Sequence, residues 1–377
     1  MLYDKVVARD RMNFIPLGRP DINDQDIEVV VNVLRSGMLV QGVNVQKLEA
    51  AFTNYHHVAH AIAVSNGTAT LHLALKVLGI GPEDEVIVPA FSYIATANVV
   101  ELTGATPVFV DIDLPTYNIN VEAIGGAITA KTKAIIPVHE FGLACDIEKV
   151  CSIANRHNIH VIEDAACALG ATQHGKTVGS FGVLGSFSLH PRKSITSGEG
   201  GVLITDNAAL AEKLRHLRNH GIDIKQGTMH FVEAGFNYRL TDFQAALALS
   251  QFQRLNTILN YKNQLAHIYL NEIKNPKLTL PVVPADWNHT WQTFHVLLNA
   301  DLDQQKVIQD LKEKGIGTNY GAQCIPAQEY YVKKYGYDAA KEFPKAYKAY
   351  SKGLAIPLYE RLTEDHVIYI AKTLNNL

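Results

Sequence analysis

A lysine in a loop flanked by glycines is the first candidate for chemistry in this sequence. The apolar stretch Gly185–Ser188 leads into a loop that carries His190, Arg192 and Lys193, and the glycine-rich turn Gly198–Gly201 follows. A lysine that is held in a cleft and partly desolvated loses its proton more readily, and its neutral amine attacks carbonyl carbons. An ordinary surface lysine has the same local sequence, so Lys193 taken alone leaves both interpretations open.

Two adjacent carboxylates supply a second candidate. Glu163 and Asp164 end the apolar stretch that begins at His160, and a run of small residues follows, which we expect to open a helix. A carboxylate buried at the end of a central strand is costly unless it is paired. The protonated ring nitrogen of pyridoxal phosphate (PLP) needs an anionic partner of this kind to act as an electron sink. Alternatively, Asp164 only caps the expected helix.

The turn Ser65–Thr68 lies between an apolar stretch and a helical one. Backbone N–H groups and the Thr68 hydroxyl could bind a phosphate dianion there, because helix N-termini attract anions. An ordinary helix cap has the same residues. Taken together, the three features predict a phosphate cradle, a carboxylate for a ring nitrogen and a Schiff-base lysine, in that chain order.

The elements that must position these residues are short strands alternating with helices. The strands are apolar throughout, which indicates an α/β fold with a mostly parallel sheet covered by helices on both faces. The expected strands are His60–Val64, Glu85–Pro89, Pro107–Asp111, Ala134–Val138, His160–Glu163, Gly185–Ser188 and Val202–Thr205, with a helix over Ala95–Thr103.

Beyond Thr241 the alternation ends. We expect one long helix over Phe243–Ile273, capped by Thr241 and Asp242, and a smaller α+β domain that begins inside it. This gives a large domain over residues 1–254 and a small C-terminal domain over 255–377, with a ligand cleft between them. The small domain's expected elements are a strand over Trp291–Leu298 and helices over Gln304–Lys314, over Tyr347–Leu354 and from Thr363 to the end.

The composition excludes several functional classes. The 377 residues carry a formal net charge of -3, which gives no electrostatic footprint for nucleic acid or anionic membranes. The four cysteines lack metal-binding spacing, so we expect no metal site. The N-terminal fourteen residues contain no signal-peptide pattern, and no apolar run reaches the ~20 residues needed to cross a bilayer, so we expect a cytoplasmic enzyme.

The sequence resembles the sugar aminotransferases of the DegT/DnrJ/EryC1/StrS family, which are PLP enzymes of fold type I (aspartate aminotransferase-like). The resemblance covers nearly the whole chain, in eleven blocks that occur in order. These blocks are Ile15–Asp21, Ser36–Gly42, Val64–Thr70, Asp84–Tyr93, Phe109–Asp113, Pro137–His139, Val161–Ala166, Phe187–Lys193, Gly198–Gly201, Gly235–Arg239 and Leu354–Tyr359.

The resemblance implies a role for each matching position. Lys193 forms the Schiff base and moves the proton, and Asp164 pairs with the pyridine nitrogen. The other implied cofactor contacts are the phosphate cradle of Gly67, Thr68 and Ser188, the stacking ring of Tyr93, and Asn237, which reaches the phosphate of the neighbouring subunit. A homodimer with shared active sites follows. Tyr93 as a core aromatic and Asn237 as a turn residue remain the alternatives.

The resemblance also implies a reaction. An amino group passes from L-glutamate to a nucleotide-linked keto-sugar, for cell-surface polysaccharide or glycoconjugate biosynthesis. The turn Gly198–Gly201 resembles the branch that aminates C4 of 4-keto-6-deoxy sugars, as perosamine synthases do. The alternatives are a 3-keto-sugar aminotransferase and a PLP-dependent sugar dehydratase. Relatives that are dehydratases replace the lysine by histidine, whereas this chain has Lys193, and His190 lies three residues before it.

Two positions depart from the family pattern. Cys167 stands where the family commonly has Gln or His, and a thiol cannot make the same strong hydrogen bond to the cofactor. A histidine that often precedes the second-domain Gln-x-Tyr-Tyr is absent from the segment Cys324–Tyr331. Substrate contacts of that segment are therefore not transferred.

Overall fold

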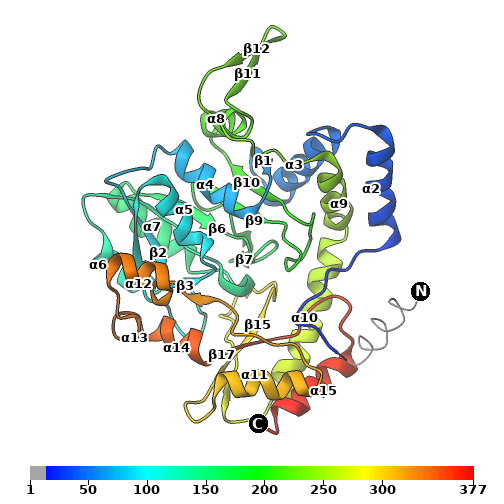
Figure 1. Cartoon of the computed structure of the whole chain (residues 1–377), viewed down its shortest axis with the longest axis vertical. Coiled ribbons are helices and arrows are strands. Elements are labelled where there is room, and N and C mark those ends of the chain that lie inside the picture. Colours follow the sequence, from blue (N-terminus) through cyan, green and yellow to red (C-terminus); the bar gives the residue numbers. More distant parts are fainter. Residues whose placement is uncertain (1–13) are drawn as a thin grey trace.

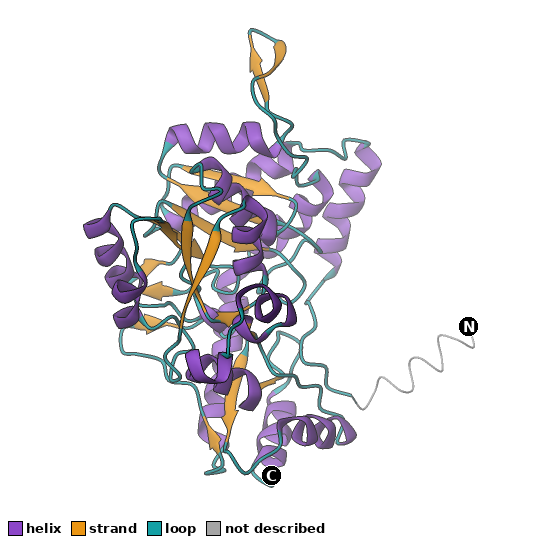
Figure 2. Ribbon diagram, turned by 60° about the vertical axis from the view of Figure 1, so that its left-hand side comes forward, coloured by secondary structure: helices purple, strands orange, loops and turns teal. Residues whose placement is uncertain are grey.

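The centre of the molecule is a seven-stranded sheet of order β1-β10-β9-β6-β5-β2-β4 (Figures 1 and 2). The computed structural model describes residues 14–377, so the expectation for the N-terminal residues 1–13 lies outside the described residues. Only β10 runs against its neighbours in this sheet, which confirms the mostly parallel sheet. The strands are β1 (His60–Val64), β2 (Glu85–Pro89), β4 (Thr106–Val110), β5 (Thr132–Ile135), β6 (His160–Asp164), β9 (Leu184–Ser188) and β10 (Gly201–Thr205).

Helices cover both faces of this sheet, as the apolar strands require. Alternate strand residues belong to different apolar clusters: Ile62 packs on one face with α4, α5 and α8, and Ala61 packs on the other with α3 and α9. The helices of the two layers are α3 (Val43–His56), α4 (Gly67–Val77), α5 (Ala95–Thr103), α6 (Val121–Ala127), α7 (Ile147–His157), α8 (Ala208–Arg218) and α9 (Asp242–Phe252).

The expected long helix over Phe243–Ile273 is wrong, because the chain breaks between α9 and α10 (Leu255–Glu272). Arg254 leaves helical geometry at the break, and its guanidinium binds the carboxylates of Asp21 and Asp26, both at 2.6 Å. These partners lie more than 200 residues away in sequence, so periodicity could not predict the break. The division into domains at residue 255 stays a prediction.

The last third of the chain divides between two apolar clusters. One surrounds β15 (Phe294–Leu298). Buried residues of the segment 324–349, such as Tyr331 and Ala346, pack instead into the cluster of the sheet that contains Ile62. The strand expected over Trp291–Leu298 is shorter by three residues, and the helix expected over Tyr347–Leu354 ends at Lys352, where a strand begins. The elements here are α11 (Gln304–Glu313), α12 (Glu329–Tyr335), α13 (Ala339–Glu342), α14 (Pro344–Lys352), α15 (Glu364–Leu374), β13 (Leu278–Thr279), β14 (Trp287–Asn288), β16 (Gln323–Cys324), β17 (Gly353–Ile356) and the 3-10 turn η2 (Ile325–Ala327).

A β-hairpin projects from the body of the molecule, at the top of Figure 1. It consists of β11 (Ile222–Lys225) and β12 (Thr228–Phe231), and several of its apolar side chains are exposed. The remaining elements are α2 (Asp24–Ser36), β3 (Phe91–Ser92), β7 (Thr172–Gln173), β8 (Lys176–Thr177) and the 3-10 turn η1 (Glu140–Gly142). Across residues 14–377, every helix is too short or too polar to cross a membrane.

Candidate active site

A cavity of about 670 Å³ opens at the carboxyl ends of β6 and β9 and at the N-terminus of α4. Because parallel strands end at the same edge of a sheet, residues from distant parts of the sequence meet there. Six of the seven predicted cofactor residues line this cavity: Gly67, Thr68, Tyr93, Asp164, Ser188 and Lys193. The seventh, Asn237, is exposed and does not belong to the described lining of this cavity.

The glycine at the start of α4 fits a tight phosphate cradle. A Cβ atom at Gly67 would lie 2.8 Å from Cβ of Ser188 and 3.0 Å from its Oγ, so the helix can approach β9 only without a side chain at this position. The Asn66 side chain caps α4 by accepting from the Ala69 N–H at 2.8 Å. A second link joins helix and strand, between the hydroxyls of Thr70 and Ser186 at 2.5 Å. The helix N-terminus therefore faces the Ser188 hydroxyl, an arrangement suited to an anion.

Asp164 lies buried on the floor of the cavity. Its Oδ2 accepts from the Thr96 hydroxyl at 2.9 Å, and its Oδ1 accepts from the Ala166 N–H at 3.2 Å. Burial raises the pKa of Asp164, while the Thr96 hydrogen bond opposes the increase. The helix expected after Asp164 is wrong, because the chain forms turns there. The alternative role of helix cap is thereby removed.

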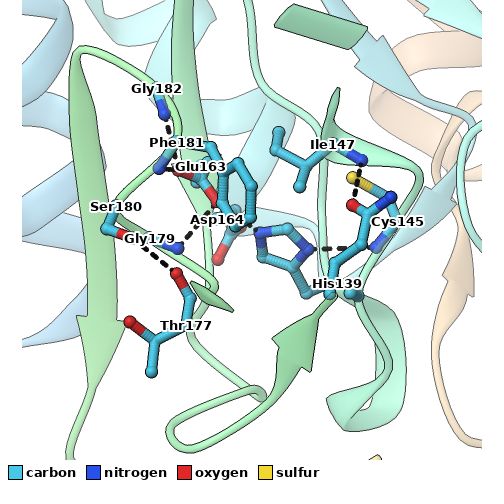
Figure 3. Close-up of polar contacts among 12 residues, drawn as sticks. His139, Cys145, Ile147, Glu163, Asp164, Thr177, Gly179, Ser180, Phe181 and Gly182 are labelled. Atoms are coloured by element: carbon cyan, nitrogen blue, oxygen red, sulfur yellow. Dashed lines mark hydrogen bonds and ion pairs between the residues drawn. The ribbon is translucent and has the colours of Figure 1, made fainter. Parts of the chain in front are cut away.

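A second buried carboxylate, Glu163, points to the opposite side of β6 (Figure 3). It accepts from the N–H groups of Gly179 at 2.7 Å, Phe181 at 2.6 Å and Gly182 at 2.7 Å. His139 Nε2 lies 3.0 Å from Oε2 of the same carboxylate.

The Cys145 N–H donates to Nδ1 of His139 at 3.1 Å, so the proton of the neutral imidazole lies on Nε2 and is donated to Glu163. Burial opposes ionisation of Glu163, but the hydrogen bonds from His139 and the backbone lower its pKa overall. This network ties the end of β6, and with it Asp164, to two neighbouring loops.

Lys193 reaches the cavity from the loop after β9, as predicted. Its Nζ donates to Sγ of Cys167 at 3.0 Å, and burial raises the pKa of that thiol. The loop is held by the Gln292 side chain, whose Nε2 donates to the Arg192 carbonyl at 2.9 Å. His190 also lines the cavity, and burial lowers its pKa.

Tyr93 lies at the cavity wall with 66% of its surface exposed, which removes the alternative of a core aromatic. Sequence reasoning missed Thr96 and Glu140, which also line the cavity. Thr96 lies on α5, outside every motif in the sequence, and only its bond to Asp164 marks it. Glu140 directly follows His139 at what the sequence indicates is an ordinary strand end, so no pattern marks it as a functional residue.

The residues present fit PLP. Gly67 lets the N-terminus of α4 lie against Ser188 at the cavity wall, Asp164 supplies a buried anion, and Lys193 supplies the primary amine that lines the described part of the cavity. The aldehyde, ring nitrogen and phosphate of PLP require these three groups.

Comparisons with known proteins agree with this chemistry. The family model of the DegT/DnrJ/EryC1/StrS aminotransferase family matches residues 20–375. The GDP-perosamine synthase of Escherichia coli O157:H7 is 36% identical over 365 residues, which cover 97% of this chain and 98% of that protein.

Solved structures that resemble this chain include two proteins with a TM-score of 0.91. Spr1654 of Streptococcus pneumoniae, in its PLP form, is 29% identical over 96% of this chain and 98% of its own. PseC of Helicobacter pylori, an aminotransferase involved in the biosynthesis of pseudoaminic acid, is 27% identical over the same shares. The chain therefore belongs to the DegT/DnrJ/EryC1/StrS aminotransferase family, and it is a PLP-dependent sugar aminotransferase.

Proposed function

We propose that the enzyme transfers the amino group of L-glutamate to C4 of a nucleotide-linked 4-keto-6-deoxy sugar, for the biosynthesis of a cell-surface polysaccharide or glycoconjugate. The observation that carries the proposal is the convergence of Lys193, Asp164 and the Gly67–Ser188 cradle in one cavity. The similarity to a GDP-perosamine synthase supports a nucleotide-linked sugar as the acceptor. Glu199, from the turn that resembles the C4 branch, lines the same cavity.

Each residue has a distinct task in this proposal. PLP supplies, when bound, an aldehyde that condenses with amines and a ring that delocalises the charge left by a departing proton. Lys193 would hold the cofactor and, as a free amine, would accept the α-proton of the donor and deliver it to the carbon on the other side of the donor's nitrogen. Asp164 keeps the ring nitrogen protonated. The α4 N-terminus, Thr68 and Ser188 bind the phosphate.

The proposed active enzyme is a homodimer, in which a second copy of the chain completes each active site. Asn237 is exposed and lies next to the base of the projecting hairpin, where its backbone pairs with Asn219. Exposed apolar side chains on the hairpin, Ile224, Met229 and Phe231, and in the loop after α2, Met38 and Val40, suit contact with another subunit. In such a homodimer Asn237 contributes to the partner's phosphate site.

The test is product formation from nucleotide-linked 4-keto and 3-keto sugars, read by mass spectrometry with and without L-glutamate. We expect a glutamate-dependent amino sugar from the 4-keto substrates, with equimolar 2-oxoglutarate. Amination of only the 3-keto substrates would show that the amino group is added at C3. Loss of water without any need for glutamate would identify a dehydratase and overturn the proposal.

A matched pair of variants separates the role of Lys193 from the general effect of removing a lysine. Lys213→Ala is the control, because it changes a lysine of α8, outside the cavity lining. We expect Lys193→Ala to lose turnover and the visible absorbance of the holoenzyme while keeping its helical circular dichroism. Lys213→Ala should keep all three.

A further inference from the structure

The cavity contains a buried acid to which the proposed reaction assigns no task. Glu140 is 4% exposed, lines the cavity together with Asp164, Cys167 and Lys193, and its Oε2 has no hydrogen-bond partner among the described residues. A buried carboxyl oxygen without a hydrogen-bond partner is costly, and such a group in a native protein calls for an explanation, of which a catalytic or binding role is one. Glu140 lies between this cavity and a smaller one on its other side, so its carboxyl group can meet a ligand that is bound beside Asp164.

The alternation of side chains along the segment after β5 explains why Glu140 faces the cavity. Val138 pairs with Asp164 in a parallel bridge, and the His139 N–H donates to the Asp164 carbonyl at 3.0 Å. Val138 and Glu140 line the cavity, whereas His139 between them points to the opposite side and meets Glu163 (Figure 3). The Glu140 N–H donates to Oδ1 of Asn118 at 2.8 Å, which fixes this backbone.

The sheet order determines which edge of a bound ring Glu140 meets. Ser188 of the phosphate cradle ends β9, Asp164 ends β6, and Glu140 follows β5, and the order in the sheet is β9-β6-β5. Asp164 therefore lies between the phosphate cradle and Glu140. In PLP, the ring edge opposite the phosphate arm carries the methyl group and the phenolic oxygen. With the ring nitrogen at Asp164 and the phosphate at Ser188, Glu140 is on the side of that phenolic oxygen.

Cys167 also lines the cavity near Glu140, but its thiol is a weak hydrogen-bond donor. We propose that Glu140, in its protonated form, donates a hydrogen bond to the phenolic oxygen of PLP and so supplies the strong contact that Cys167 cannot make. This inference deepens the proposed function and rests on its placement of PLP between Asp164 and Ser188.

The charges around Glu140 favour the protonated form at neutral pH. Burial and the negative charge of Asp164 raise the pKa of Glu140 to about 8, while Lys193 and hydrogen bonds from the Ser92 side chain and the Phe141 backbone oppose the increase. The other titratable groups that face it are Cys167 beside the lysine, and Tyr117, His289 and His295 in a small cavity on its other side. Burial lowers the pKa of both histidines to about 3 and raises that of Tyr117, so these three are neutral.

The test follows the visible band of the holoenzyme, whose pH midpoint reports protonation of the nitrogen that joins Lys193 to PLP. A donor on the phenolic oxygen withdraws electron density and lowers this midpoint. We expect Glu140→Leu to raise the midpoint by about one pH unit, the worth of one hydrogen bond, and Glu140→Gln, which keeps a neutral donor, to leave it within a few tenths.

An anionic Glu140 gives the opposite sign, because removal of a nearby negative charge lowers the midpoint in both variants. That outcome, or no shift in either variant, would overturn the inference. A second measurement does not involve PLP: the difference between the infrared spectra of the wild-type and Glu140→Gln apoproteins should contain, at pH 7, the band of a protonated carboxylic acid, and that band should disappear near pH 8. Absence of that band from the difference spectrum at pH 7 would also overturn the inference.

The parallel variant Lys193→Ala separates the placement of PLP from the role of Glu140. If Lys193→Ala keeps the visible band, the placement of PLP fails, whatever Glu140 does. If Lys193→Ala loses the band and the two Glu140 variants leave the midpoint unchanged, the placement stands and the role of Glu140 fails.

Discussion

Replacement of Gly67 by alanine tests the phosphate cradle with the smallest possible change. The added Cβ would lie 2.8 Å from Cβ of Ser188, whereas ordinary contacts begin at 3.4 Å. The N-terminus of α4 must therefore move away from β9 by roughly half an ångström or more, and overpacking of this kind costs about 1–3 kcal/mol. Because the displaced groups are those that bind the phosphate, we expect a Kd for PLP that is about 10- to 100-fold higher.

The assay is titration of the apoprotein with PLP, followed by absorbance, with circular dichroism as the check on folding. Gly126→Ala is the matched control, because a Cβ there meets no atom within 4 Å and the residue lies inside α6. This control should bind PLP as the wild type does and be slightly more stable, since alanine favours a helix over glycine. A folded Gly67→Ala protein with wild-type affinity for PLP would refute the cradle.

Three further predictions concern Asp164, its supporting network and the second subunit. Thr96→Val removes the hydrogen bond to Asp164 at 2.9 Å and so raises the pKa of that carboxyl; we expect kcat to fall about 10-fold and the acid limb of the pH profile to move upward, with Thr96→Ser as the conservative rescue. An unchanged acid limb in Thr96→Val would contradict this role. Glu163→Gln breaks a buried network, and we expect a loss of about 3–5 kcal/mol in unfolding free energy at pH 7. The folded-state pKa of Glu163 is lowered, so its contribution is present above the unfolded value of about 4.3 and is lost as the pH falls through the folded value. The difference in Tm between wild type and variant should therefore narrow below about pH 4, and a constant difference would count against this explanation. Finally, mixing inactive Lys193→Ala with inactive Asn237→Ala subunits should restore about one quarter of wild-type activity, because half of the dimers are mixed and each has one intact site. If activity does not recover after the subunits have exchanged, the active site is not shared between subunits.

Much of the site could be predicted because its residues directly follow strand ends. Asp164 and Lys193 stand at or just after the ends of apolar strands, and Gly67 opens a helix after another, so local patterns located them. Glu140 could not be found in this way. It begins a 3-10 turn in which the following residue, Phe141, has a φ of 56°. Only the bridge between Val138 and Asp164 brings Glu140 to the cavity.

The errors in secondary structure have similar causes. The small residues after Asp164 favour a helix locally, but the Asp164 carboxylate accepts the Ala166 N–H, and Gly170 adopts a φ of 95° that ends any helical path. The break at Arg254 depends on carboxylates from the N-terminal part of the chain. At Arg254 a tertiary contact outweighs the local preference, and no window of sequence contains that contact.

The site at which PLP is covalently attached tests the assignment of Lys193 as the Schiff-base lysine. Reduction of the holoenzyme with borohydride fixes the cofactor to its lysine, and peptide mass spectrometry then identifies that residue. We expect the label on Lys193 alone. A label on another lysine, such as the buried Lys262 behind the same loop, or no label on a PLP-loaded protein, would contradict this assignment.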